Sequence, residues 1–182
     1  MTRLRSLVRF QSRAIGIYVV FFVLKSLLEN ISILCYHTLM NMLLPLNMGQ
    51  FRSVVTMLAG MYAGSRLLDN IGFVQHGSTN LHEHCKNVAL LSLDIADRFH
   101  ITVDRRSLIR GALLHDYYLY DWHDKNARPH LHGFVHPSIA LKNARRDFDL
   151  NDIEADIIVH HMFPLTFFPP MSREGWIVTI AD

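Results

Sequence analysis

The sequence predicts an all-α fold. After about residue 50, apolar residues recur at spacings of three and four over several successive segments, which is the period of one helix face. Residues that favour helix starts stand in front of these segments, and no segment alternates apolar and polar residues over a length typical of a strand. Half of the 182 residues are hydrophobic, so the chain has enough apolar surface for a sizeable core.

Four local signals place the helix starts. Asp104 is a plausible N-cap for a helix over 105–116, and Pro137 suits the first turn of a helix that continues to about residue 148. Asn151 with Glu154 three residues later is typical of a capping box, and Ser172 is expected to cap the final helix. These signals predict short helices joined by loops, with no internal repeat.

The N-terminal part differs in composition from the rest, and we expect it to form a helical extension over 1–60, followed by a domain over 61–182. A basic start precedes an apolar run, 14–24, that is shorter than the roughly 20 residues needed to cross a bilayer. Two interpretations stay open. The apolar segments form buried helices, or residues 3–45 contact a membrane, where the arginines would meet anionic lipid.

Charge and cysteine content limit the classes of function and location. The net charge of +2 is too balanced to predict a nucleic-acid partner. Cys35 and Cys85 do not suggest a disulfide framework, so a reducing compartment is the simpler interpretation. We therefore expect a cytoplasmic protein, with membrane association through the N-terminal segment as the open alternative.

Histidine is the compositional outlier, and it is concentrated in one region. Eleven of the twelve histidines lie between His76 and His161. Four helix faces also carry a polar residue in line with their apolar stripe, and Asp116 directly follows one of them. A buried polar side chain costs several kcal/mol unless it is paired, and a shared metal ion would remove that cost for all of them. The four residues are His84, His115, His161 and Asp182.

The same residues resemble the HD superfamily of metal-dependent phosphohydrolases, whose pattern is a histidine, a His–Asp pair and a distant aspartate. The matching segments are LHEHCKNVALLSLDIA with His84, GALLHDYY with His115 and Asp116, and WIVTIAD with Asp182. The resemblance covers roughly residues 72–182 and implies that the domain is an HD-domain helical bundle. It also implies that such a domain continues beyond Asp182, so a chain that stops there is expected to be truncated.

Some members of the superfamily bind two metal ions through two further histidines. The resemblance then implies one ion on His84, His115, Asp116 and Asp182, and a second on His136 and His161, with Asp116 between them. His132 is the alternative to His136. His160 is the alternative to His161, but adjacent helical residues point about 100° apart, and the stripe through Ile153 and Ile157 favours His161. Fe, Mn, Mg, Zn and Ni all remain candidates for the divalent ion.

The implied reaction is hydrolysis of a phosphoester or phosphoanhydride in a small phosphorylated, nucleotide-like substrate, with a metal-activated water. Asp116 is expected to take part in catalysis, and Lys125 and Arg128 to contact the phosphate, although solvated loop charges are an equal interpretation of those two. The alternative function is a metal- and nucleotide-binding regulatory module with little turnover.

Overall fold

The computed structural model describes residues 47–182 except 77–78, 125 and 127–128. The apolar segments within residues 1–46, and with them the question of membrane contact, lie outside the described residues. Among the helices that are described, none is both long enough and apolar enough to span a bilayer.

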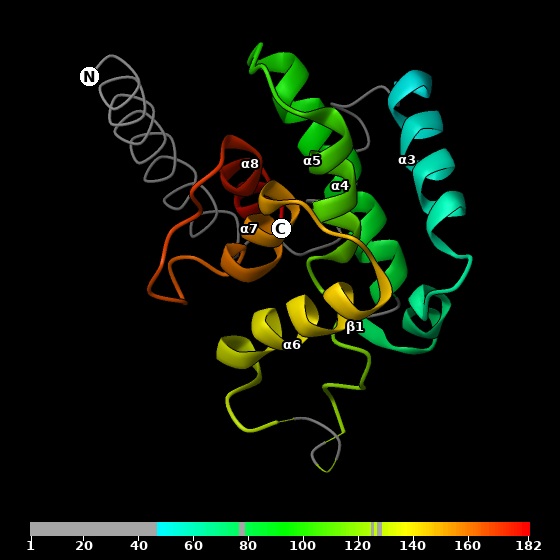
Figure 1. Cartoon of the computed structure of the whole chain (residues 1–182), viewed down its shortest axis with the longest axis vertical. Helices are drawn as coiled ribbons and strands as arrows, with labels where there is room; N and C mark the ends of the chain where they lie inside the picture. The colour runs from blue at the N-terminus through cyan, green and yellow to red at the C-terminus, as the bar shows by residue number, and fades with distance from the viewer. Residues whose placement is uncertain (1–46, 77–78, 125, 127–128) are drawn as a thin grey trace. The chain divides into compact units, whose positions relative to one another are not determined.

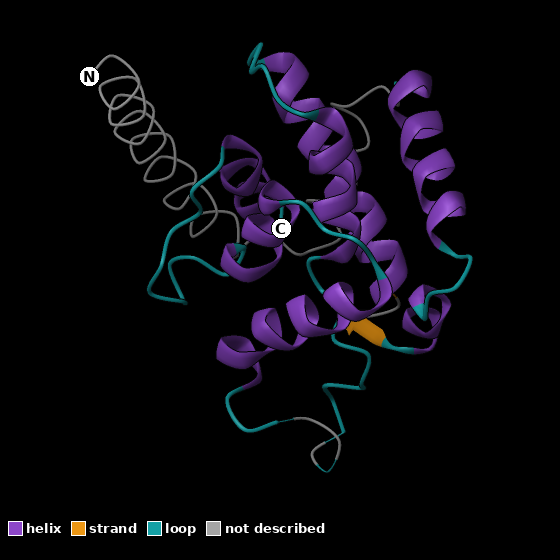
Figure 2. Cartoon of the chain, in the orientation of Figure 1, coloured by secondary structure: helices purple, strands orange, loops and turns teal. Residues whose placement is uncertain are grey.

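The described chain is helical apart from one short ribbon, which confirms the all-α prediction (Figure 2). The two strands of the ribbon pair antiparallel and hold five residues in total. The elements run in the order α3 (Met48–Met61), the 3-10 helix η1 (Leu67–Gly72), β1 (Val74–His76), β2 (Thr79–Asn80), α4 (Leu81–Arg98), α5 (Arg105–Leu114), α6 (His132–Asp147), α7 (Asp152–His160) and α8 (Arg173–Ala181).

Three of the helix starts are built as their sequence signals predict. The Asp104 side chain accepts hydrogen bonds from the main chain of the first turn of α5. Asn151 and Glu154 form a complete capping box at the start of α7, and the Ser172 hydroxyl accepts a hydrogen bond from Gly175 N at the start of α8. Because these caps satisfy main-chain N–H groups within three residues, local sequence is enough to specify them.

The start of α6 differs from the prediction. The helix begins at His132, so Pro137 lies inside it instead of in its first turn. Leu131, which precedes the helix, adopts a left-handed conformation with φ of 59°. Pro137 lacks the N–H that would bond to the carbonyl of Gly133, four residues earlier, so the helix runs through the proline without that main-chain hydrogen bond. The extra turn places His136 well inside the helix.

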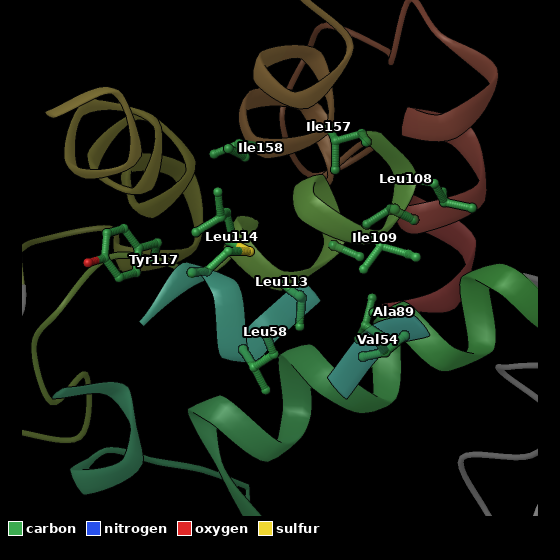
Figure 3. Close-up of a cluster of buried hydrophobic side chains, with 14 of the residues drawn as sticks. Val54, Leu58, Ala89, Leu108, Ile109, Leu113, Leu114, Tyr117, Ile157 and Ile158 are labelled. Carbon is green, nitrogen blue, oxygen red and sulfur yellow. The ribbon is translucent and has the colours of Figure 1, made fainter. Parts of the chain in front are cut away.

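One hydrophobic core joins α4, α5, α7 and α8. Helix α4 packs against α5 and α8, and α7 packs against α5, α6 and α8 (Figure 1). Figure 3 shows part of this core, with Leu108 and Leu113 of α5 and Ile157 of α7 among its side chains. These side chains are almost completely buried. The core therefore fixes the relative positions of the helices that carry the residues singled out above.

Helix α3 packs on the outside of this core. Its buried face holds Val54, Leu58 and Met61, and it contacts α4 and α5. The compact unit accordingly begins at Met48. The domain boundary expected between residues 60 and 61 stays a prediction.

Candidate metal centre

The fold brings six of the sequence-predicted site residues to one place, each from the end of a helix or the turn next to it. His84 lies in the first turn of α4, His115 and Asp116 directly follow α5, and His136 lies in the second turn of α6. His161 and Asp182 follow the last residues of α7 and α8. All six side chains are buried or half-buried.

The first half of the centre gathers around Asp182. His84 Nε2 lies 2.9 Å from Asp182 Oδ1, and His115 Nε2 lies 3.4 Å from the same oxygen. Asp116 Oδ2 lies 3.6 Å from His115 Nε2 and 3.9 Å from His84 Nε2. Two imidazole nitrogens and two carboxylate oxygens therefore face one another.

The second half lies on the other oxygen of Asp116. Asp116 Oδ1 is 3.1 Å from His136 Nε2 and 3.5 Å from His161 Nε2. The two Nε2 atoms are themselves 2.9 Å apart. The carboxylate thus presents one oxygen to each pair of histidines.

Hydrogen bonds to the main chain fix which ring nitrogen faces the centre. A carbonyl oxygen only accepts, so each Nδ1 in these bonds carries its proton, and Nε2 of a neutral ring then offers a lone pair. In the second half, the Nε2 lone pairs of His136 and His161 would point at one another and repel. A proton or a cation shared between the two nitrogens removes this repulsion. The three bonds run from His115 Nδ1 to Ala112 O (2.7 Å), from His136 Nδ1 to His132 O (3.0 Å) and from His161 Nδ1 to Ile158 O (2.9 Å).

The pKa shifts show how the carboxylates and imidazoles of the centre affect one another. Burial acts to raise the pKa of Asp116, but the neighbouring His115 leads the interactions with histidines that outweigh burial and hold it well below its usual range. Burial acts to lower the pKa of His115, but Asp116 leads the interactions that raise it well above the ordinary value. Burial lowers the pKa of His161, which keeps that ring neutral. An ionised carboxylate and a protonated His115 therefore face each other.

The donor set fits a divalent cation. His84, His115 and Asp182 form one group, and His115, Asp116 and His161 form another, in which all the ligand atoms lie within 4.8 Å of one another. Among the described residues, His115 Nε2 is buried and makes no well-formed hydrogen bond, although it faces two carboxylates. Two nitrogens bound to one ion at about 2.1 Å and at a right angle stand roughly 3 Å apart, close to the separation of the His136 and His161 nitrogens.

The two alternative histidines face elsewhere. His132 Nδ1 lies 2.8 Å from Tyr120 Oη, and its ring stacks on Trp122 at 5.4 Å between centroids. His160 Nδ1 lies 2.8 Å from Asp156 Oδ1, on a different side of α7 from His161. His136 and His161 are therefore the members of each pair that face Asp116.

The two basic residues of the predicted site, Lys125 and Arg128, lie outside the described residues, so their contact with phosphate stays a prediction. The aromatic residues that follow the His–Asp pair mainly pack the chain onto the core, since Tyr117 and Tyr118 are buried. Tyr117 Oη donates to Asp147 and accepts from the main-chain N–H of Arg66.

A helical domain that gathers four histidines and two aspartates from the ends of five helices belongs to the class of all-α domains whose histidines and aspartates could hold divalent metal ions. A model of the HD domain family matches residues 81–182, which is more than half of the chain, and the chain belongs to that family. HD domains form a family of metal-dependent phosphohydrolases that bind divalent metals. No curated protein and no solved structure matches this chain.

Proposed function

We propose that the chain hydrolyses a phosphoester or phosphoanhydride of a small, nucleotide-like molecule at a centre that binds two divalent metal ions. The orientation of Asp116 is the observation that carries this proposal. Its Oδ2 faces His84 and His115, while its Oδ1 faces His136 and His161. A carboxylate with a separate group of nitrogen donors at each oxygen is placed to bridge two ions.

The proposed ligands follow from this division. One ion would be held by His84, His115, Asp116 and Asp182, and the other by His136, His161 and Asp116. When bound, a pair of divalent ions supplies a hydroxide at neutral pH and offsets charge on the phosphoryl oxygens. The mixture of imidazole and carboxylate ligands suits Fe, Mn, Zn and Ni, and Mg is the fifth candidate.

The chain itself supplies the shape and the charge of the site. Asp116 stays ionised at neutral pH because the surrounding imidazoles hold its pKa well below the usual range. The side chains of His115 and His161 are fully buried and exclude water from the inner side of the centre, whereas those of His84 and Asp182 are each 18% exposed. We infer that the substrate approaches from the edge formed by His84 and Asp182.

Lys125 and Arg128 are proposed to contact the phosphate of the substrate. They belong to the segment that follows the His–Asp pair, and guanidinium and ammonium groups are the usual protein partners of phosphate oxygens. Replacing both with alanine should lower kcat/KM for a phosphorylated substrate and leave the metal content unchanged. A double variant with unaltered kinetics would remove these two residues from the proposal.

The purified full chain, loaded with Mn²⁺ or Fe²⁺ and incubated with a panel of nucleotides and phosphomonoesters, tests the function. Release of inorganic phosphate or nucleoside, abolished in Asp116→Ala, supports the hydrolase. Tight nucleotide binding without turnover supports instead the regulatory module. Oxygen consumption with a polyol-like substrate would assign the centre to redox chemistry and would overturn the proposal.

A further inference from the structure

Asp156 is a carboxylate that the centre itself does not use, yet it carries a dense set of hydrogen bonds. It lies in the middle of α7, and its side chain is only 10% exposed. Its Oδ1 faces His160 Nδ1 at 2.8 Å and Met171 N at 2.9 Å. Its Oδ2 accepts from Ser172 N at 2.8 Å and from the Ser172 hydroxyl at 2.5 Å.

These bonds join α7 to the first turn of α8. The Ser172 hydroxyl donates to Asp156 and accepts from Gly175 N at 2.9 Å, so the residue that caps α8 is itself held by α7. The negative carboxylate also lies at the helix end where the main-chain N–H groups give a partial positive charge. The carboxylate of Asp156 therefore fixes the place where α8 begins.

Gly175 shows how closely the two helices meet at this point. A Cβ atom on Gly175 would lie 2.8 Å from Asp156 Oδ2 and 2.8 Å from Pro170 Cβ. Both distances are too short for real contacts. Pro170 Cβ belongs to a ring, and Asp156 Oδ2 is held by its hydrogen bonds from Ser172. The first turn of α8 rests directly on the Asp156 carboxylate, with no space for a side chain between them.

Each of the two helices joined in this way ends at a proposed metal ligand. His161 follows the last residue of α7, and Asp182 follows the last residue of α8. Helix α8 has nine residues and behaves as a short rigid rod, so a shift at its start moves Asp182 at its end. We propose that Asp156 is a positioning residue of the metal centre, which sets the separation of His161 and Asp182 by holding the start of α8 against α7.

This inference rests on the proposed metal centre, and its test measures metal binding by the full chain. Mn²⁺ is titrated into the metal-free protein, free Mn²⁺ is followed by electron paramagnetic resonance, and circular dichroism shows that each variant is folded. Asp156→Ala should raise the Mn²⁺ Kd by at least about tenfold, in the range found for groups that orient metal ligands. Gly175→Ala should also raise the Mn²⁺ Kd, because the added methyl group pushes the start of α8 away from α7 while Asp156 is intact.

Asp104→Ala is the matched control. Asp104 is also a capping carboxylate, and it accepts from Arg106 N, Ser107 N and the Ser107 hydroxyl. All of these partners lie on its own helix. The Ser107 hydroxyl also accepts from Asn151 Nδ2 at 2.7 Å, a bond between α5 and α7 that does not use the Asp104 carboxylate. The substitution therefore weakens one helix end and leaves the bonds between α7 and α8 in place. The control should leave the Mn²⁺ Kd within about twofold of wild type, well below the change expected for a lost orienting group.

Each result has one meaning. Folded Asp156→Ala and Gly175→Ala proteins with the wild-type Kd would overturn the positioning role and leave the metal centre standing. An equal rise of Kd in Asp104→Ala would also overturn it, because any weakened helix end would then have the same effect. A wild-type chain that binds no Mn²⁺ would overturn the metal centre and the positioning role together. If Asp156→Ala does not fold, Ser172→Ala and Gly175→Ala decide the question by the same Kd criterion.

Discussion

Gly111→Ala should destabilise the protein, although alanine is the better helix former. Gly111 lies in α5, where the helix crosses α7. A Cβ atom at this position would lie 2.3 Å from Ile157 Cδ1 and 3.0 Å from both Cβ and Cγ2 of the same side chain. Ile157 is completely buried, so it has no free space into which to move.

The size of the effect follows from two opposing contributions. Replacing glycine with alanine inside a helix stabilises it by about 1 kcal/mol. Inserting a methyl group into a packed core costs about 1–3 kcal/mol, and the upper half of this range applies because the clash involves Ile157 Cβ, which a change of rotamer does not remove. The variant should therefore lose roughly 1–2 kcal/mol of unfolding free energy.

Urea unfolding of the full chain measures this difference, and a double-mutant cycle with Ile157→Val locates its cause. Valine removes Cδ1, the atom with the shortest contact, so the double variant should be more stable than the sum of the single effects by about 1 kcal/mol. If Gly111→Ala were as stable as wild type, or if the two substitutions were simply additive, the close approach of α5 and α7 at this point would be refuted.

Two further predictions concern protons. Asp104→Ala should cost about 1 kcal/mol at neutral pH through loss of the cap. The side chain and the main-chain N–H of Ser107 lower the pKa of Asp104 in the folded state. The stabilisation is therefore present above the unfolded pKa near 4 and is lost as the pH falls through the lower folded pKa. In urea unfolding, the stabilities of wild type and variant should converge at acid pH, and a difference that does not change with pH would contradict the capping role of the ionised Asp104. Metal binding at neutral pH should release protons, because the pKa of His115 is raised well above its ordinary value in the metal-free chain. Calorimetry of metal binding in two buffers of different ionisation enthalpy measures the release. Identical binding heats in the two buffers would rule it out.

The sequence was informative where a structural feature depends on neighbouring residues. The caps at Asp104, Asn151 and Ser172 satisfy main-chain groups within three residues, so a local pattern is enough to locate them. The start of α6 was predicted wrongly because proline is common in the first turn, whereas the actual start depends on the left-handed conformation of Leu131.

For the site, the periodicity of the apolar stripes and the family resemblance together identified the residues that the fold brings together. From the sequence, His136 is already expected, with His132 as the alternative, and the structure adds the geometry: the His136 ring faces Asp116, whereas His132 lies against Tyr120. The role of Asp156 at the start of α8 left no signal in the sequence, since apart from His160 its partners are main-chain and hydroxyl groups 15 and 16 residues further along the chain. Long-range hydrogen bonds of this kind have no fixed spacing from which they can be recognised.

The ratio of metal to protein tests the bridging role of Asp116 most directly. The full chain is reconstituted anaerobically with Fe²⁺ or Mn²⁺, desalted and analysed for bound metal, alongside His136→Ala and Asp116→Ala. Wild type is predicted to retain about two ions, His136→Ala about one, and Asp116→Ala close to none, because that carboxylate is a ligand in both halves. A full complement of metal in Asp116→Ala would contradict the two-metal centre.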